Sequence, residues 1–229
     1  MSGIQDYWEF VDDFFGAGTF LAAPLGGDLW DITDTSTAGT PTYVYVDGSS
    51  SGEVALDFDS QEEIQNVCLS NKDILQFDID KIQGAEFRVK MNQAAVDATT
   101  QVAFGLAGDR NDAIDTIAQA ALFRVIGADS TTAVVVETDD GTTNNDDVAT
   151  GQTLINAYKT FKIDFSQGTS DVRFFMDDGN GSLKRVAAST TFDMSAYTGS
   201  LQAYVQLQKT ADANTDGVTI DYVKIWGKR

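Results

Sequence analysis

The sequence predicts an all-β protein built as an antiparallel β-sandwich or jelly roll. Apolar and polar residues alternate with a period of two along most of the 229 residues, which is the pattern of half-buried strands. Short clusters rich in Asp, Asn, Gly and Ser, such as 47–52 and 177–182, separate these segments and are typical of turns. Because no long helices stand between the segments to make crossovers, we expect antiparallel pairing in two packed sheets.

Eleven segments are expected to form strands. In chain order they are residues 43–46, 53–58, 64–70, 85–91, 101–106, 119–126, 132–138, 158–165, 171–177, 201–209 and 218–226. Within 85–91 charged side chains alternate with Phe, Val and Met, so one face of this strand should be wet and the other packed. One short helix is expected at 109–118. We expect residues 21–229 to form a single jelly-roll domain.

Residues 1–20 contain six aromatic side chains and are treated as a separate segment. The rings are spaced too densely for one face of a strand to bury them all. Two interpretations are open: an edge strand that closes over the domain's own core, or an arm that docks on a sister subunit or another protein. On the second interpretation the partner-contact residues are Trp8, Phe10, Phe14 and Phe15.

Charge and cysteine content narrow the classes of partner. Lys and Arg number 15 and Asp and Glu number 35, which gives a formal net charge of −20. This charge repels phosphate backbones and anionic lipid, so neither nucleic acid nor a membrane is expected as a partner. Cys68, the only cysteine, stands in an apolar stretch and should be buried without a disulfide. The N-terminal stretch lacks the basic start of a signal peptide, and no apolar run approaches the ~20 residues of a spanning helix, so a protein made in a cytoplasm is expected.

The residue types that most hydrolytic sites need are missing. The chain has no histidine, which excludes Ser–His and Cys–His pairs, and it has no glycine-rich phosphate-binding motif. Glu137 and Asp139 share one strand face and come nearest to a carboxylate pair for glycoside hydrolysis. Asp139 begins a polar stretch that turns at Gly141, so a hairpin loop is the preferred interpretation and no enzyme activity is expected.

The stretch DANTDG at 212–217 has the D-x-N-x-D-G spacing of a calcium-binding loop. Its oxygen ligands would come from Asp212, Asn214 and Asp216. The bidentate acid at position twelve of such a loop is missing, since that position is Val223. The same letters suit a tight turn, and we expect the stretch to join two paired strands. Calcium is the secondary interpretation, and no other cofactor is expected.

Two motifs in the last third of the chain resemble those of a known fold family. In YKTFKIDFSQGTSDVRFFMDDG (158–179) a strand ending in Ile-Asp leads to one ending in Asp-Gly, and VTIDYVKIW (218–226) closes the chain. Both are similar to motifs of concanavalin A-like jelly-roll domains. The glucanase branch of that superfamily carries a catalytic E-x-D-x-x-E strand. Glu137 and Asp139 match only its first half, so the resemblance does not carry hydrolysis over to this chain.

The chain as a whole, with FVDDFFG at 10–16 and FGLAGDRND at 104–112, is also similar to jelly-roll structural proteins of tailed bacteriophages. This resemblance implies a non-enzymatic capsid decoration (cement) protein that stabilises a phage head, with the virion as its location. Its implied partners are the major capsid protein and further copies of itself, with a trimer as the first expectation.

A carbohydrate-binding or host-attachment module on the same fold is the alternative function, and a glycanase is the third. Such a module would stack sugars on exposed rings. The available rings are Trp30, Tyr43, Tyr45, Tyr197 and Trp226, most of which should belong to the core.

Overall fold

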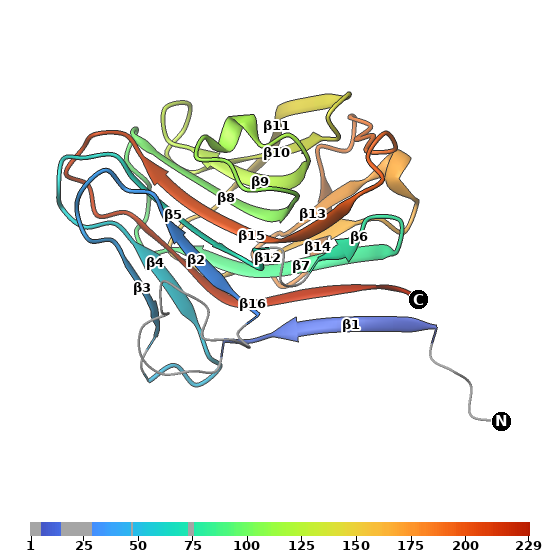
Figure 1. Ribbon diagram of the computed structural model, residues 1–229, viewed down its shortest axis with the longest axis horizontal. Coiled ribbons are helices and arrows are strands. Elements are labelled where there is room, and N and C mark those ends of the chain that lie inside the picture. Colours follow the sequence, from blue (N-terminus) through green and yellow to red (C-terminus); the bar gives the residue numbers. More distant parts are fainter. Residues whose placement is uncertain (1–5, 15–28, 47, 73–75) are drawn as a thin grey trace.

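The computed structural model describes residues 6–14, 29–46, 48–72 and 76–229, which form a β-sandwich. Two eight-stranded sheets stack face to face, and every strand pair within them is antiparallel (Figure 1). The fold class expected from the alternating sequence is therefore confirmed. In the described part of the chain, no helix has the length and apolar character needed to cross a bilayer.

Sheet A has the strand order β14-β13-β12-β7-β16-β4-β3, and β1 also pairs with β16. Its strands are β1 (Tyr7–Asp12), β3 (Thr42–Tyr45), β4 (Val54–Asp57), β7 (Ile82–Met91), β12 (Lys159–Asp164), β13 (Arg173–Asp177), β14 (Leu183–Val186) and β16 (Gly217–Lys228). The long strand β16 pairs with β7 along one edge. Along its other edge it pairs first with β4 and then with β1, so β1 continues the sheet where β4 ends.

Sheet B has the strand order β11-β10-β9-β8-β15-β5-β2, and β6 also pairs with β15. Its strands are β2 (Asp31–Asp34), β5 (Gln65–Ser70), β6 (Phe77–Asp78), β8 (Thr100–Ala107), β9 (Ala120–Ile126), β10 (Ala133–Asp139), β11 (Asn144–Thr153) and β15 (Ser200–Lys209). The polar stretch after Gly141, expected as a hairpin loop, instead forms β11 at the sheet edge. Its polar side chains are tolerated because an edge strand is largely solvated.

The helix expected at 109–118 is wrong in extent. The described helices are single 3-10 turns, η1 (Ile114–Thr116) and η2 (Thr169–Asp171). The connection that contains η1 lies over the outer face of sheet B, where Ile114 and Ile117 are each 1% exposed. A spacing of three residues is satisfied by one 3-10 turn, so the two isoleucines can be buried without a longer helix.

The core between the sheets is organised around phenylalanines that come from both layers. Phe104 of β8 packs edge-to-face on Phe161 of β12 at 4.7 Å between ring centroids. Phe123 of β9 does the same with Phe174 of β13 at 5.2 Å. Such aromatic pairs contribute about 0.5–1.5 kcal/mol each beyond the burial of their area. The alternation read from the sequence places these rings inward, and the polar residues between them face outward.

The N-terminal aromatic segment is a strand of sheet A. Trp8 stacks on Phe77 at 5.0 Å between centroids, and Phe10 also contacts Phe77. Phe14 is 2% exposed against Trp30. The structure thus places Trp8, Phe10 and Phe14 on the core of their own chain, which is the geometry of the edge-strand interpretation. Their contact with a partner remains a prediction, and Phe15 lies outside the described residues.

Asp12 fixes the end of this strand. Its carboxylate accepts the backbone N–H of Phe14 at 2.8 Å and the indole N–H of Trp30 at 2.7 Å. Tyr7 and Val11, on the opposite side of β1, are 61% and 52% exposed. The segment therefore has a packed face and an open face, as its burial alternation shows.

Candidate functional site

The loop 210–216 that carries the expected calcium motif connects the two sheets. It runs from β15 of sheet B to β16 of sheet A, around one end of the sandwich (Figure 1). The expectation that it joins two paired strands is therefore wrong. A polar stretch ending in Gly suits any sharp reversal, and the local sequence does not reveal whether the next strand pairs in the same sheet or packs in the other.

The side chains of the motif form hydrogen bonds within the loop and with the neighbouring turn at 97–99. Asp212 accepts the backbone N–H of Asn214 at 3.0 Å. The amide of Asn214 donates to Thr99 Oγ1 at 2.9 Å, and Asp216 accepts the backbone N–H of Asp97 at 2.6 Å. The three expected ligands are thus already hydrogen-bonded within the protein.

A cation of the protein itself lies beside them. Lys209, the last residue of β15, is 0% exposed, and its ammonium donates to the backbone carbonyls of Asp59, Gln61 and Asn214, each at 2.9 Å. Three donors meet three acceptors, so the ammonium is fully satisfied. Burial lowers the pKa of Lys209, and the nearby carboxylates, Asp59 first among them, oppose that shift. The Lys209 ammonium thus places a positive charge beside the loop, where the carboxylates of Asp212 and Asp216 also act on its pKa.

The carboxylates of β10 lie on the outer face of sheet B. Glu137 is 1% exposed and accepts a hydrogen bond at 2.5 Å from Arg124, which is also 1% exposed. Burial raises the pKa of Glu137 to about 7, although the charge of Arg124 opposes this. A carboxyl group with such a pKa is a candidate proton donor, but this one is sealed from solvent. Asp139, the other half of the pair, accepts the backbone N–H of Gly141 at 2.7 Å.

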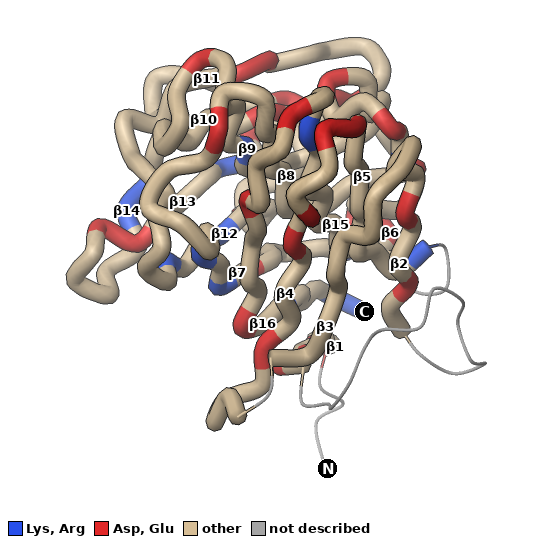
Figure 2. Tube along the Cα trace, turned by 90° about the vertical axis from the view of Figure 1, so that its left-hand side faces the viewer, with Lys and Arg blue, Asp and Glu red and all other residues tan. Residues whose placement is uncertain are grey.

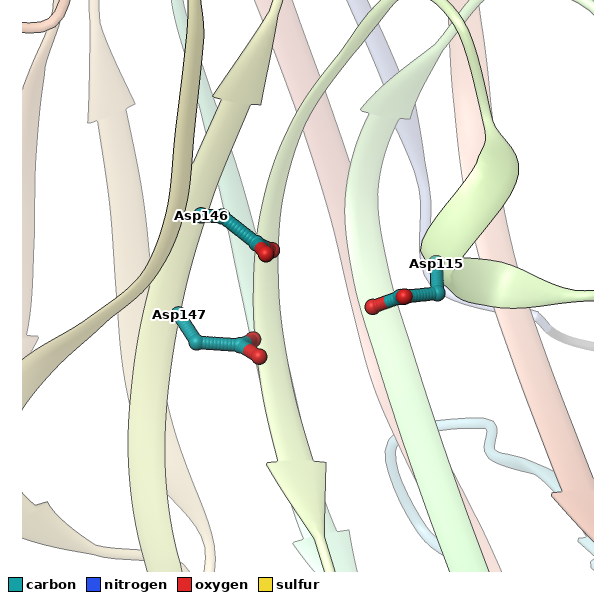
Figure 3. Close-up of side chains that lie close together, drawn as sticks. All are labelled: Asp115, Asp146 and Asp147. Carbon is teal, nitrogen blue, oxygen red and sulfur yellow. The ribbon is translucent and has the colours of Figure 1, made fainter.

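Three further carboxylates surround the same arginine. Asp115 comes from η1 and Asp146 and Asp147 from β11, and Figure 3 shows them turned toward a common space. Their oxygens lie within 4.8 Å of one another, a spacing that would suit a metal ion. Arg124 Nη1 already lies 3.0 Å from Asp115 and 3.1 Å from Asp147. Here a cation of the protein, the Arg124 guanidinium, neutralises the carboxylates.

The rest of this face is covered by the η1 connection. Ile114 and Ile117 pack in a cluster with Leu122, Tyr204 and Cys68. Cys68 is buried as expected, and burial raises the pKa of its thiol to about 12, which keeps it protonated and unreactive. The middle of the outer face of sheet B is therefore a second packed layer, closed to a large ligand.

The outer face of sheet A is open, and Trp226 lies partly exposed on it. In the sheet register Trp226 of β16 stands opposite Gly84 of β7. A Cβ atom on Gly84 would lie 2.4 Å from Cζ2 of Trp226, so the indole lies directly over the glycine backbone. A glycine inside a strand marks such a close approach. The missing side chain is what lets the ring settle onto the sheet.

Charged side chains flank this ring. Lys224, Glu86 and Lys162 form one row across β16, β7 and β12. The ammonium groups of Lys162 and Lys224 lie 5.6 and 5.7 Å from the centroid of Trp226. Glu86 accepts the hydroxyl of Tyr222 at 2.6 Å, and burial together with Glu86 raises the pKa of Tyr222 to about 12, so this phenol stays a donor.

A groove, named here the Trp226 groove, is lined by Tyr7, Trp8, Glu9, Glu86, Lys162, Leu183, Lys224 and Trp226. Its volume is 710 Å³, and Tyr7 and Leu183, which are 61% and 37% exposed, contribute apolar surface to it. The groove combines an aromatic floor with donors and acceptors at its sides, which is the composition of a site for a polar ligand with apolar faces.

Of the five rings that the sequence offers for stacking, Trp226 is the one that lines this groove. Trp30 is 5% exposed, and Tyr43 and Tyr197 pack against the core. Tyr45 packs against the core as well but also lines a second groove on the same face of sheet A. Sequence reasoning missed Gly84, Lys162 and Lys224. The signal for Gly84 was available, because it stands just before an alternating strand segment.

No protein-family model matches the chain, and no curated protein matches it in sequence. Solved structures match it in shape. A protein of unknown function, SO2946 from Shewanella oneidensis MR-1, has a TM-score of 0.61 and 10% identity, over 100% of this chain and 89% of that one. The carbohydrate recognition domain of Emp47p has a TM-score of 0.57 and 11% identity, over 93% of this chain and 95% of that one.

An enzyme has the same fold. The Bacteroides ovatus mixed-linkage glucan GH16 protein, solved with a G4G4G3G product, has a TM-score of 0.59 and 13% identity, over 94% of this chain and 99% of that one. At these identities the likeness shows the concanavalin A-like jelly roll and no activity. These neighbours give no support to the capsid decoration role expected from the phage resemblance.

Proposed function

We propose that this protein is a non-enzymatic carbohydrate-binding domain that holds a glycan against Trp226. The observation that carries the proposal is the indole seated over Gly84 in an open groove. The apolar face of a pyranose ring can stack on such an indole, while its hydroxyls reach the flanking lysines and Glu86. The likeness to a carbohydrate recognition domain and to a glucan-bound GH16 protein supports a glycan as the ligand class.

Binding without hydrolysis is supported by the state of the β10 carboxylates. Glycoside hydrolysis needs two carboxyl groups that flank the scissile bond. Glu137 is sealed by Arg124, and Asp139 is engaged with the turn at Gly141. The histidine that could replace them as an acid or base is absent from the whole sequence.

The test is calorimetric titration of glycans selected on an array, with two variants of the groove. Trp226→Ala should weaken binding about thirtyfold, the equivalent of the ~2 kcal/mol of an aromatic hot spot. Gly84→Ala should weaken it too, because the new methyl group displaces the indole. Ile64→Ala, which truncates an exposed apolar side chain outside the groove, should change nothing. Full affinity in Trp226→Ala, or no binding by any glycan, contradicts the proposal.

A location on a phage particle is a separate proposal, and the resemblance of 10–16 and 104–112 supports it. On a virion the domain would attach to a host glycan or decorate the capsid. Mass spectrometry of purified particles tests this location, and the absence of the chain from particles made by its own phage would overturn it.

A further inference from the structure

The face that carries the Trp226 groove has a second groove at its other end. This Lys90 groove has a volume of 640 Å³, and its lining includes Tyr45, Glu53, Lys90 and Asn92. It opens beside β7 and β16, as the first one does, and Thr219 of β16 belongs to its lining. Because the two grooves lie on one face of the sheet, a single long ligand could occupy both.

Strand β7 connects the two grooves directly. Glu86 lines the first and Lys90 the second, and Arg88 stands between them on the same side of the strand. Four residues of strand span about 13 Å, so both grooves are within reach of one extended chain. A terminal sugar would fill only one of them.

The surface between the grooves also combines an aromatic ring with cationic side chains. Arg88 lies over the ring of Tyr158 at 4.4 Å, and Lys90 Nζ lies 4.5 Å from the centroid of the same ring. Arg88 also forms an ion pair with Asp221. Aromatic rings flanked by cations thus recur along β7, from Trp226 at one end to Tyr158 at the other.

Cations and carboxylates alternate on this face of an acidic molecule. Lys and Arg lie around β7, β12 and β14, while Asp and Glu lie around β16 and predominate in the loops at the top of the view (Figure 2). Four carboxylates of this face are engaged with its own donors, namely Glu9 with Lys224, Asp164 with Lys162, Glu86 with Tyr222 and Asp221 with Arg88, and Glu53 also lines the Lys90 groove.

The net charge of −20 does not exclude an anionic ligand here. The two sheets are separated by about 10 Å, and charges are screened over about 8 Å at physiological ionic strength. The distant acids of sheet B therefore act weakly on a carboxylate in contact with Lys90, Lys162 or Lys224. Such a carboxylate would share each ammonium with the acid beside it, Glu9 at Lys224, Asp164 at Lys162 and Glu53 in the Lys90 groove.

We propose that the ligand is a linear polysaccharide that carries carboxylate groups and lies along β7 across both grooves. The proposal rests on the proposed function, since it specifies the glycan bound at the Trp226 groove. The Trp226 end supplies stacking, and the lysines at the two ends receive the uronate carboxylates.

The experiment compares hexasaccharides made of uronic acids with neutral hexasaccharides, together with the monosaccharide of the best binder. We expect a uronate hexasaccharide to bind best and its monosaccharide to bind at least about tenfold more weakly, which is the effect of losing one charge-assisted contact. If no glycan binds, the proposed function fails. If a neutral hexasaccharide binds as tightly, or the monosaccharide matches the hexasaccharide, the function stands and this inference is overturned.

Two lysine variants locate the chain on the face. Lys90→Gln should weaken the hexasaccharide about tenfold, again one charged contact, and leave a disaccharide unaffected. Lys228→Gln removes the same charge from a residue that lines neither groove and should change neither affinity. Unchanged hexasaccharide binding in Lys90→Gln would confine the ligand to the Trp226 groove and contradict the proposal.

Discussion

The outer faces of the two sheets are built from similar residue types but are covered differently. On sheet B the η1 connection lies over the strands, and Arg124 and Glu137 are each 1% exposed. On sheet A, Trp226, Lys162 and Lys224 remain partly exposed in a groove. Sealed charges must satisfy one another and act on stability, whereas open charges can exchange their partners for a ligand. Exposure, more than residue type, separates the structural face from the proposed recognition face.

The largest expected effect breaks the sealed pair. Arg124→Met should destabilise the fold by about 3–5 kcal/mol at neutral pH, because it leaves a buried carboxylate without its partner. Replacing both members, as in Arg124→Met with Glu137→Leu, should restore most of that loss, since an apolar pair needs no compensation. Urea unfolding measures both variants. A double variant as unstable as the single one would show that Arg124 stabilises the fold chiefly through Asp115 and Asp147 and not through Glu137.

The second effect concerns the buried ammonium of Lys209, which lies beside the loop in which the sequence suggested calcium. Lys209→Met should cost on the order of 3 kcal/mol, because three carbonyls lose their donor. Lys159→Met is the matched control: its ammonium reaches one carbonyl, that of Thr153, from a half-exposed position, and the change should stay within about 0.5 kcal/mol.

Calcium sharpens the same experiment. Millimolar calcium should raise the melting temperature of Lys209→Met more than that of the parent protein, because the variant leaves the Asp212 loop without a cation. Equal stabilisation of both proteins, lost in Asp216→Ala, would place a true calcium site beside Lys209.

A smaller effect follows from the pKa of Glu137. Its value in the fold, about 7, is above the usual 4.5, so the folded state binds more protons between these values. Stability contributed by this group is thus complete at low pH and declines as pH rises from about 4.5 to 7. Thermal melts of the parent protein and of Glu137→Gln across that pH range measure the contribution of Glu137 to the pH dependence of stability. A difference between the two that does not change with pH would contradict the raised pKa.

The sequence predicted the layers of the fold better than their connections. Alternation identified inward rings such as Phe104 and Phe161, because burial on one face imposes a period of two. The Asp212 loop was assigned to a hairpin, since turn residues report a reversal and not the sheet that receives the next strand. The helix predicted at 109–118 was too long. Its isoleucines are buried against the outer face of sheet B, and this tertiary contact needs only a single 3-10 turn.

Only part of the candidate site could be predicted from the sequence. Trp226 was predicted as one of five rings that could stack on a sugar. Its position over Gly84 depends on the pairing of β16 with β7, which joins residues far apart in the chain. Likewise, Glu137 matched half of a catalytic pattern, and its burial under Arg124 depends on the neighbouring strand. Both positions depend on the register between paired strands, which cannot be read from a single sequence.

The central claim is that sheet A, and not sheet B, receives the glycan. Backbone and indole N–H chemical shifts measured during titration with the best-binding oligosaccharide test it directly, because Trp226 and Trp8 line the groove and Trp30 is buried outside it. The account predicts large shifts for the Trp226 indole and along β7 and β16, with Trp30 and the strands β9 and β10 unchanged. Shifts concentrated around Arg124 and Glu137, with Trp226 unmoved, would contradict it.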